Sequence, residues 1–179
     1  RALQSITYPA SFLLVAALNP CPCGFYGDKK RQCTCSPQLI ERYLQKLSGP
    51  LLDRIDLQIH VPGVDYETVK STTISETSQN MQAHITKARE AQMARFKNEL
   101  RWNAEMQSHE IEDWCALTEG AEQIIKKVFD KLHLSMRGYH KVLKVSRTIA
   151  DLEGSSIINE QHIKEALSYR SLDRYFEKG

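Results

Sequence analysis

The sequence lacks the features that mark a membrane protein or a self-contained hydrolase. No apolar run approaches the roughly 18–20 residues of a membrane span, and no signal peptide is present. There is also no Gly-x4-Gly-Lys-Ser/Thr phosphate-binding loop, no nucleophile elbow and no paired-carboxylate arrangement. The 6 histidines stand singly, without metal-binding spacing. We therefore expect a cytoplasmic protein without a membrane partner, whose chemistry does not rest on a hydrolase triad.

Charge and composition are equally unremarkable. The formal net charge of +2 at pH 7 is too small to indicate a nucleic-acid partner by itself. A hydrophobic content of 41% and a charged content of 26% are ordinary for a globular protein. The 179 residues suffice for one domain or two small ones. Because the chain starts at Arg1, without Met and just before an apolar run, we interpret it as a fragment of something larger.

Cysteines, in contrast, are concentrated in one place. Four of the 5 lie in the pattern C-P-C-x9-C-x-C, at Cys21, Cys23, Cys33 and Cys35, whereas Cys115 stands alone. Four thiolates satisfy a tetrahedral zinc ion, and such a site has no open position for catalysis, so we predict structural Zn²⁺. The C-x-C spacing departs from the commoner C-x2-C, which leaves transient disulfides or unligated thiols as alternatives. The basic tip of this loop, residues 29–31, could touch phosphate or simply be solvated.

Two segments flanking this loop have strand patterns. Phe12–Leu18 is apolar at every position, as in a strand buried on both faces, and Leu57–Val61 alternates apolar and polar residues. Between them, Ser36 followed by Pro37 is a good helix start, and the apolar spacing predicts a helix over 37–47. This part of the chain is therefore expected to be a piece of an α/β subdomain.

Beyond Pro62-Gly63 the composition shifts toward helices. Residues 64–75 are expected to be a linker, and the spacing of apolar residues then predicts helices over 78–96, 110–116, 119–132 and 135–153, with a last one after the cap Asn159. The predicted fold class is α+β, mostly α. The predicted domains are 1–63, which carries the cysteine insertion 21–35, and a helical domain over 64–179.

Three polar residues are candidates for a ligand site. Asn19 follows the first predicted strand, where α/β proteins place ligand-contacting groups, although Asn-Pro is also a common turn. Arg54, in L-L-D-R-I-D, could be a surface arginine paired with Asp53 or Asp56. Arg137 lies in the first turn of a predicted helix, where the helix dipole disfavours a cation unless an anion is supplied.

Three segments together resemble one known family. LLVAALNPCPCG, SGPLLDRIDLQIHVPGV and SMRGYHKVLKVSRTIADLEGSSIINEQHIKEALSYR resemble the C-terminal half of the magnesium-chelatase-like AAA+ ATPases, over about residues 1–170. The four-cysteine insertion, which true chelatase ATPase subunits lack, favours the YifB/ComM branch. Arg147, within R-T-I-A-D-L, also matches the family and is interpreted as structural or interfacial.

The resemblance implies roles for the three polar residues. Asn19 corresponds to the sensor 1 position, Arg54 to the arginine finger that enters the ATP site of a neighbouring subunit, and Arg137 to sensor 2. It further implies ATP and Mg²⁺ as cofactors, a hexameric homo-oligomer, and a DNA branch-migration helicase as the whole protein. The family's phosphate-binding loop and Mg²⁺-binding strand are missing from this sequence, so the fragment alone is expected to be inactive. The alternatives are the motor of a porphyrin metal chelatase and a zinc-finger adaptor that binds DNA or protein.

Overall fold

The computed structural model describes residues 12–170, apart from gaps at 29, 48, 65, 67–69, 71–75, 98 and 132–133. The chain divides into two compact units, Arg1–Leu47 and Ser48–Gly179. Most of the linker predicted over 64–75 lies outside the described residues, as do both ends of the chain. The predicted domain boundary at residue 63 remains a prediction.

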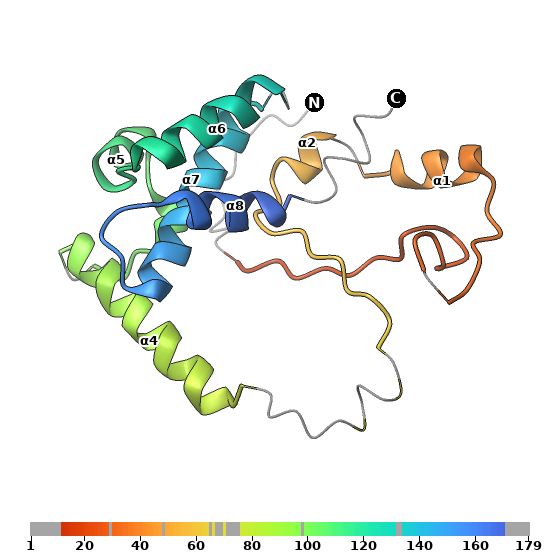
Figure 1. The fold of residues 1–179 in the computed structure, drawn as a ribbon, viewed down its shortest axis with the longest axis horizontal. Helices are drawn as coiled ribbons and strands as arrows, with labels where there is room; N and C mark the ends of the chain where they lie inside the picture. The colour runs from red at the N-terminus through yellow and green to blue at the C-terminus, as the bar shows by residue number, and fades with distance from the viewer. Residues whose placement is uncertain are drawn as a thin grey trace, which may run out of the picture. The chain divides into compact units, whose positions relative to one another are not determined.

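The described part of the first unit contains one helix, α1 (Pro37–Leu44), preceded by the cysteine loop (Figure 1). The Ser36 hydroxyl caps α1 by accepting a hydrogen bond from the Leu39 N–H at 3.3 Å, and Pro37 opens its first turn. The helix predicted over 37–47 is therefore confirmed, with its end at Leu44.

The prediction of a strand over Phe12–Leu18 is wrong for the part of the chain that the structure describes. This segment forms no helix or strand, and Leu13 is 89% exposed. A strand needs a neighbour that accepts and donates its backbone hydrogen bonds, and no described residue supplies one. The predicted strand Leu57–Val61 is also absent; Gln58 forms a single isolated parallel bridge with Arg170.

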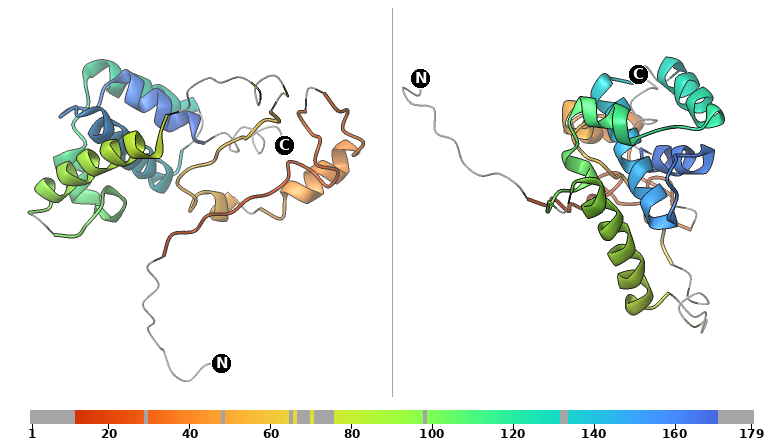
Figure 2. Two further views of the ribbon diagram at one scale, coloured as in Figure 1. Left: turned by 90° about the horizontal axis from the view of Figure 1, so that it is seen from below. Right: turned by 90° about the vertical axis from the view of Figure 1, so that its left-hand side faces the viewer.

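The second unit is helical, as predicted, and is built around α7 (Figures 1 and 2). Among its described residues the elements are α2 (Gly49–Leu52), α4 (Ser78–Arg95), the 3-10 helix η1 (Asn103–Glu105), α5 (Ser108–Trp114), α6 (Glu119–Lys131), α7 (Met136–Glu153) and α8 (Glu160–Ser168). Helix α7 packs against α4, η1, α5 and α8. The core between them contains Val142, Leu143 and Ala150 of α7, together with Ile111, Ile125 and Ile163.

Local signals set the ends of these helices. The Thr77 hydroxyl caps α4, the Ser135 hydroxyl caps α7 by accepting from the Gly138 N–H at 3.0 Å, and the Asn159 side chain caps α8. Gly154 ends α7 in the left-handed conformation, with φ of +79°, which a residue with a side chain rarely adopts. No described helix is both long and apolar enough to cross a membrane.

A buried polar network joins α4, η1 and α7. The Asp151 carboxylate accepts two hydrogen bonds from Arg95, at 2.9 and 2.6 Å, and one from Arg147 at 3.1 Å. Asn103 donates to the same carboxylate at 2.8 Å. Arg147 is 1% exposed and also donates to the carbonyls of Ser155 and Ser156. The structural interpretation of Arg147 is therefore confirmed.

Candidate functional site

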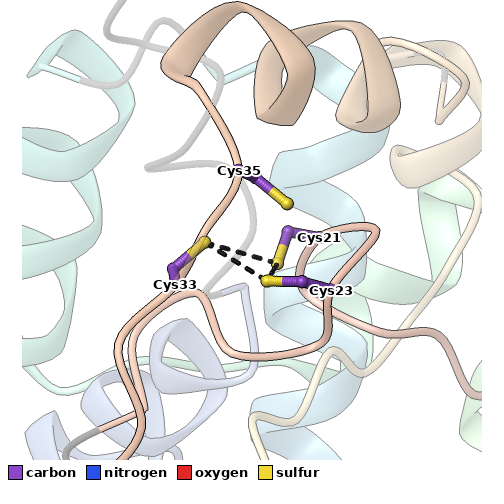
Figure 3. A group of neighbouring side chains, drawn as sticks. All are labelled: Cys21, Cys23, Cys33 and Cys35. Carbon is purple, nitrogen blue, oxygen red and sulfur yellow. Dashed lines mark hydrogen bonds between the residues drawn. The ribbon is translucent and has the colours of Figure 1, made fainter.

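The four clustered cysteines converge on one point (Figure 3). The Sγ atom of Cys21 lies 3.3 Å from that of Cys23 and 3.7 Å from that of Cys33, and the Cys23 and Cys33 Sγ atoms are 3.5 Å apart. With Cys35 included, all four sulfurs lie within 4.8 Å of one another. Cys115 lies apart from them, in the helical core.

Tight turns bring the two C-x-C pairs together. Gly24 and Gly27 both have φ of +84°, and the Gly24 N–H closes a turn onto the Cys21 carbonyl at 3.0 Å. At the tip of the loop, the Asp28 carboxylate accepts from the backbone N–H groups of Lys30 and Arg31, at 2.6 and 3.0 Å. The chain thus reverses within the nine-residue spacer and returns Cys33 to Cys23.

The thiols have unlike proton affinities. Backbone N–H groups of Phe25 and Thr34 lower the pKa of Cys23 to about 5, which favours a thiolate. The N–H of Cys35 lowers the pKa of Cys33, but desolvation and the adjacent sulfurs of Cys23 and Cys21 outweigh it and raise this pKa to about 12. A negative charge already present at one sulfur makes the others hard to ionise without a cation among them.

The geometry of the sulfurs fits a tetrahedral metal. With a Zn–S bond of about 2.3 Å, the sulfurs of a regular tetrahedron are about 3.8 Å apart. The three separations among Cys21, Cys23 and Cys33, 3.3 to 3.7 Å, are close to that edge and far longer than the ~2 Å of a disulfide. The four cysteines, all within 4.8 Å of one another, could therefore hold a metal ion.

The second unit carries a basic hollow. This hollow, with a volume of about 420 Å³, is lined by Arg54, Met136, Arg137, His140, Lys141 and Lys144. Arg54 belongs to the turn after α2, whereas the other residues lie on the first two and a half turns of α7. Of the three ligand-site candidates predicted from the sequence, the structure therefore brings two, Arg54 and Arg137, to one surface.

The electrostatics of this hollow suit an anion. Arg54 and Arg137 are both exposed, and Arg137 makes no hydrogen bond or ion pair with any described residue. Arg54 donates to the Pro50 carbonyl at 2.7 Å. Desolvation lowers the pKa of Lys144, because burial disfavours its charge. An anion in the hollow would offset this cost and would also meet the positive end of the α7 dipole.

Sequence reasoning missed the remaining basic residues. Lys141 and Lys144 follow Arg137 by four and seven positions, so the helical period places all three on one face of α7. That spacing was visible in the sequence, but a lysine on a helix is ordinarily a solvated surface residue. Only the packing of residues 53–56 against α7 shows that this face lines a hollow.

Asn19 belongs to the first unit, whereas all the residues that line the basic hollow belong to the second. It lines a shallow hollow of about 390 Å³ with Ala17, Leu18 and Tyr43, and its side chain is exposed. Its role as sensor 1 therefore remains a prediction.

Comparisons with known proteins identify the family of this chain. Residues 1–69 match the family described as "Magnesium chelatase, subunit ChlI", and residues 75–170 match "Magnesium chelatase, subunit ChlI C-terminal". The chain belongs to the magnesium chelatase ChlI family.

Individual members of the ChlI family are similar over nearly the whole chain. Competence protein ComM of Haemophilus influenzae is 45% identical over 179 residues, and the uncharacterized protein YifB of Escherichia coli is 41% identical over 175 residues. These alignments cover 99% and 97% of the chain but only 34% of either relative. The chain thus spans about a third of the length of these ChlI-family relatives, and its resemblance to ComM and YifB is confirmed.

Proposed function

We propose that these residues form the sensor and lid portion of a ring-forming AAA+ ATPase, with Arg54 and Arg137 acting on the phosphates of bound ATP. The observation that carries the proposal is the basic hollow, in which both arginines lie beside Lys141 and Lys144. Phosphoryl transfer is catalysed mainly by positive charge placed around the γ-phosphate, together with Mg²⁺. A hollow with these side chains supplies such charge, although the sequence contains no phosphate-binding loop.

The shared hollow constrains how the two arginines act. If Arg54 is an arginine finger that enters the ATP site of a neighbouring subunit, Arg137 must face the same nucleotide. Both would then stabilise charge at one γ-phosphate, and Asn19 would orient the attacking water as sensor 1 in a different subunit. A finger arginine can be worth ~10³–10⁵ in rate, so loss of Arg54 should be far more damaging than loss of an ordinary surface cation.

For the cysteine cluster we propose structural Zn²⁺ held by Cys21, Cys23, Cys33 and Cys35. The support is the near-tetrahedral spacing of the sulfurs. Zinc would fix the loop that carries Lys30, Arg31 and the exposed ring of Tyr26, which are groups suited to contact nucleic acid. Four sulfur ligands leave no position for water, so the ion would take no part in hydrolysis.

For the whole protein we propose a hexameric, cytoplasmic DNA motor that couples ATP hydrolysis to branch migration. The support is the 45% identity to a relative named as a competence protein and the presence of the cysteine loop.

The deciding experiment uses the full-length protein, with its phosphate-binding loop. We expect Arg54→Ala to reduce the rate of ATP hydrolysis at least about a thousandfold while leaving the dissociation constant for ATP unchanged. Lys127→Ala, which removes an exposed lysine of α6, is the matched control and should hydrolyse ATP normally. Branched DNA should stimulate the wild-type rate at a fixed salt concentration, because phosphate contacts depend steeply on salt. Normal hydrolysis by Arg54→Ala would refute the finger role, and no effect of DNA would refute the DNA motor.

A further inference from the structure

Lys141 connects α7 to the turn that carries Arg54. Its Nζ atom lies 2.8 Å from the Asp56 carboxylate and also donates a hydrogen bond to the backbone carbonyl of Arg54. Two of the three ammonium donors are thereby directed at residues 54–56. A lysine that holds a carbonyl and a carboxylate two residues apart restrains the position of the intervening backbone.

A second contact joins the same turn to the start of α7. The Ser135 hydroxyl donates to the Asp53 carboxylate at 3.0 Å while it accepts the capping hydrogen bond from Gly138. Arg170 lies 3.3 Å from the other oxygen of Asp53. Asp53, just before Arg54, is therefore bound to the N-cap of α7, and Asp56, two residues after Arg54, is bound to Lys141 of the same helix.

From these contacts we infer that Lys141 is a positioning residue for Arg54, which it holds on α7 so that Arg54 and Arg137 approach a single nucleotide as one rigid body. The inference rests on the proposed function, because it assigns Lys141 a role in that same site.

The alternative role for Lys141 is direct contact with phosphate, and the structure favours positioning. The Lys141 side chain is 17% exposed, whereas Arg54 and Arg137 are both exposed. Its charge is already paired with Asp56 at 2.8 Å, whereas Arg137 has no partner among the described residues. A phosphate would have to compete with Asp56 for Lys141, but not for Arg137.

The size of the effect follows from what positioning is worth. Misplacement of a catalytic group by about 1 Å can cost on the order of 100-fold in rate. Loss of Lys141 leaves Asp53–Ser135 in place, so the turn would be loosened and not released. We therefore expect a decrease in turnover of about 10- to 100-fold, smaller than that caused by Arg54→Ala.

The test compares Lys141→Ala, Lys141→Arg and Asp56→Asn in the full-length protein. Turnover and the dissociation constant for ATP are measured for each, with Lys127→Ala and Asp113→Asn as controls that remove an exposed charge of the same sign. Positioning predicts that Lys141→Ala and Asp56→Asn both lose turnover at unchanged ATP affinity. It also predicts that Lys141→Arg recovers most of the rate, because a guanidinium can reach both acceptors.

Asp56→Asn separates the two roles, since it leaves Lys141 in place and makes the hollow more positive. If Asp56→Asn hydrolyses ATP at the wild-type rate while Lys141→Ala is slow and binds ATP more weakly, Lys141 acts by contact with phosphate and positioning is refuted. Full turnover by Lys141→Ala refutes it as well. These results are distinct from failure of the proposed function, which would appear as normal hydrolysis by Arg54→Ala.

Discussion

Asp151→Ala is expected to destabilise the helical unit more than removal of any single apolar methyl group would. The Asp151 carboxylate is 2% exposed and accepts hydrogen bonds from Arg95, Arg147 and Asn103. Its removal leaves the guanidinium of Arg147, 1% exposed, without a counter-ion beside that of Arg95. Removing one partner of a buried ion pair costs about 3–5 kcal/mol.

Urea unfolding followed by tryptophan fluorescence measures this cost directly. Both tryptophans of the chain, Trp102 and Trp114, lie in the helical unit, so their emission reports its unfolding. At about 2–4 °C per kcal/mol, the same loss should lower the melting temperature by roughly 10 °C. Asp113→Ala, an exposed aspartate of α5, should change the free energy of unfolding by less than about 0.5 kcal/mol.

Asp151→Asn refines the test, because asparagine keeps the shape of the side chain but not its charge. It should fall between the wild type and Asp151→Ala, since one amide oxygen still accepts hydrogen bonds from the arginines. A free energy of unfolding for Asp151→Ala within about 1 kcal/mol of the wild type would refute the reasoning, because two buried guanidinium groups would then tolerate each other without a carboxylate.

Two further outcomes follow from the cysteine cluster and from an ion pair. Cys33→Ser should abolish stoichiometric zinc binding, measured by atomic absorption after gel filtration, whereas Cys115→Ser should keep it; equal zinc in both would contradict the assignment. Hydrogen bonds from Arg101 and from the Gln107 N–H lower the pKa of Glu110 to about 2, from an ordinary 4.5. Its contribution to stability is thus present above about pH 4.5 and is lost as the pH falls toward 2. Glu110→Gln should therefore lower the melting temperature at pH 7 and progressively less at lower pH; a constant difference would refute this.

The helices were predictable because their signals are local. Ser135 and Asn159 cap helices within three residues of themselves, and Gly154 ends α7 through its own backbone conformation. The expectation of 135–153 for α7 differs by one residue from the observed Met136–Glu153. None of these signals depends on what lies elsewhere in the chain.

The strands failed for the opposite reason. An apolar run such as Phe12–Leu18 indicates that a segment can be buried. Its backbone hydrogen bonds as a strand, however, must come from residues far away in sequence. No described residue pairs with the backbone of Phe12–Leu18, and the side chains of this segment are exposed. For Leu57–Val61 one such partner exists, since Gln58 donates to the Tyr169 carbonyl at 2.7 Å, but one bridge is not a strand.

The cysteine cluster could be predicted from the sequence because only one short loop has to fold. The nine residues between Cys23 and Cys33 can bring the pairs together whatever the rest of the chain does, and the two glycines supply the left-handed turns. The basic hollow could not be predicted in this way, because it depends on contacts between segments that are distant in sequence. Residues 53–56 and 135–144 are about eighty positions apart, and nothing local predicts that Lys141 reaches the Arg54 carbonyl.

The contrast between Arg137 and Arg147 shows how far an argument from charge can go. Both arginines lie on α7, and both match the family segment, so neither periodicity nor resemblance separates their roles. Arg147 can be buried because Asp151, one turn later, neutralises its charge and the Ser155 and Ser156 carbonyls accept hydrogen bonds from it. Arg137 lies at the positive end of the same helix, and no described residue offsets its charge there. A cation in an unfavourable field and without an internal partner contributes little to folding. We therefore propose that Arg137 binds an anion from outside the chain.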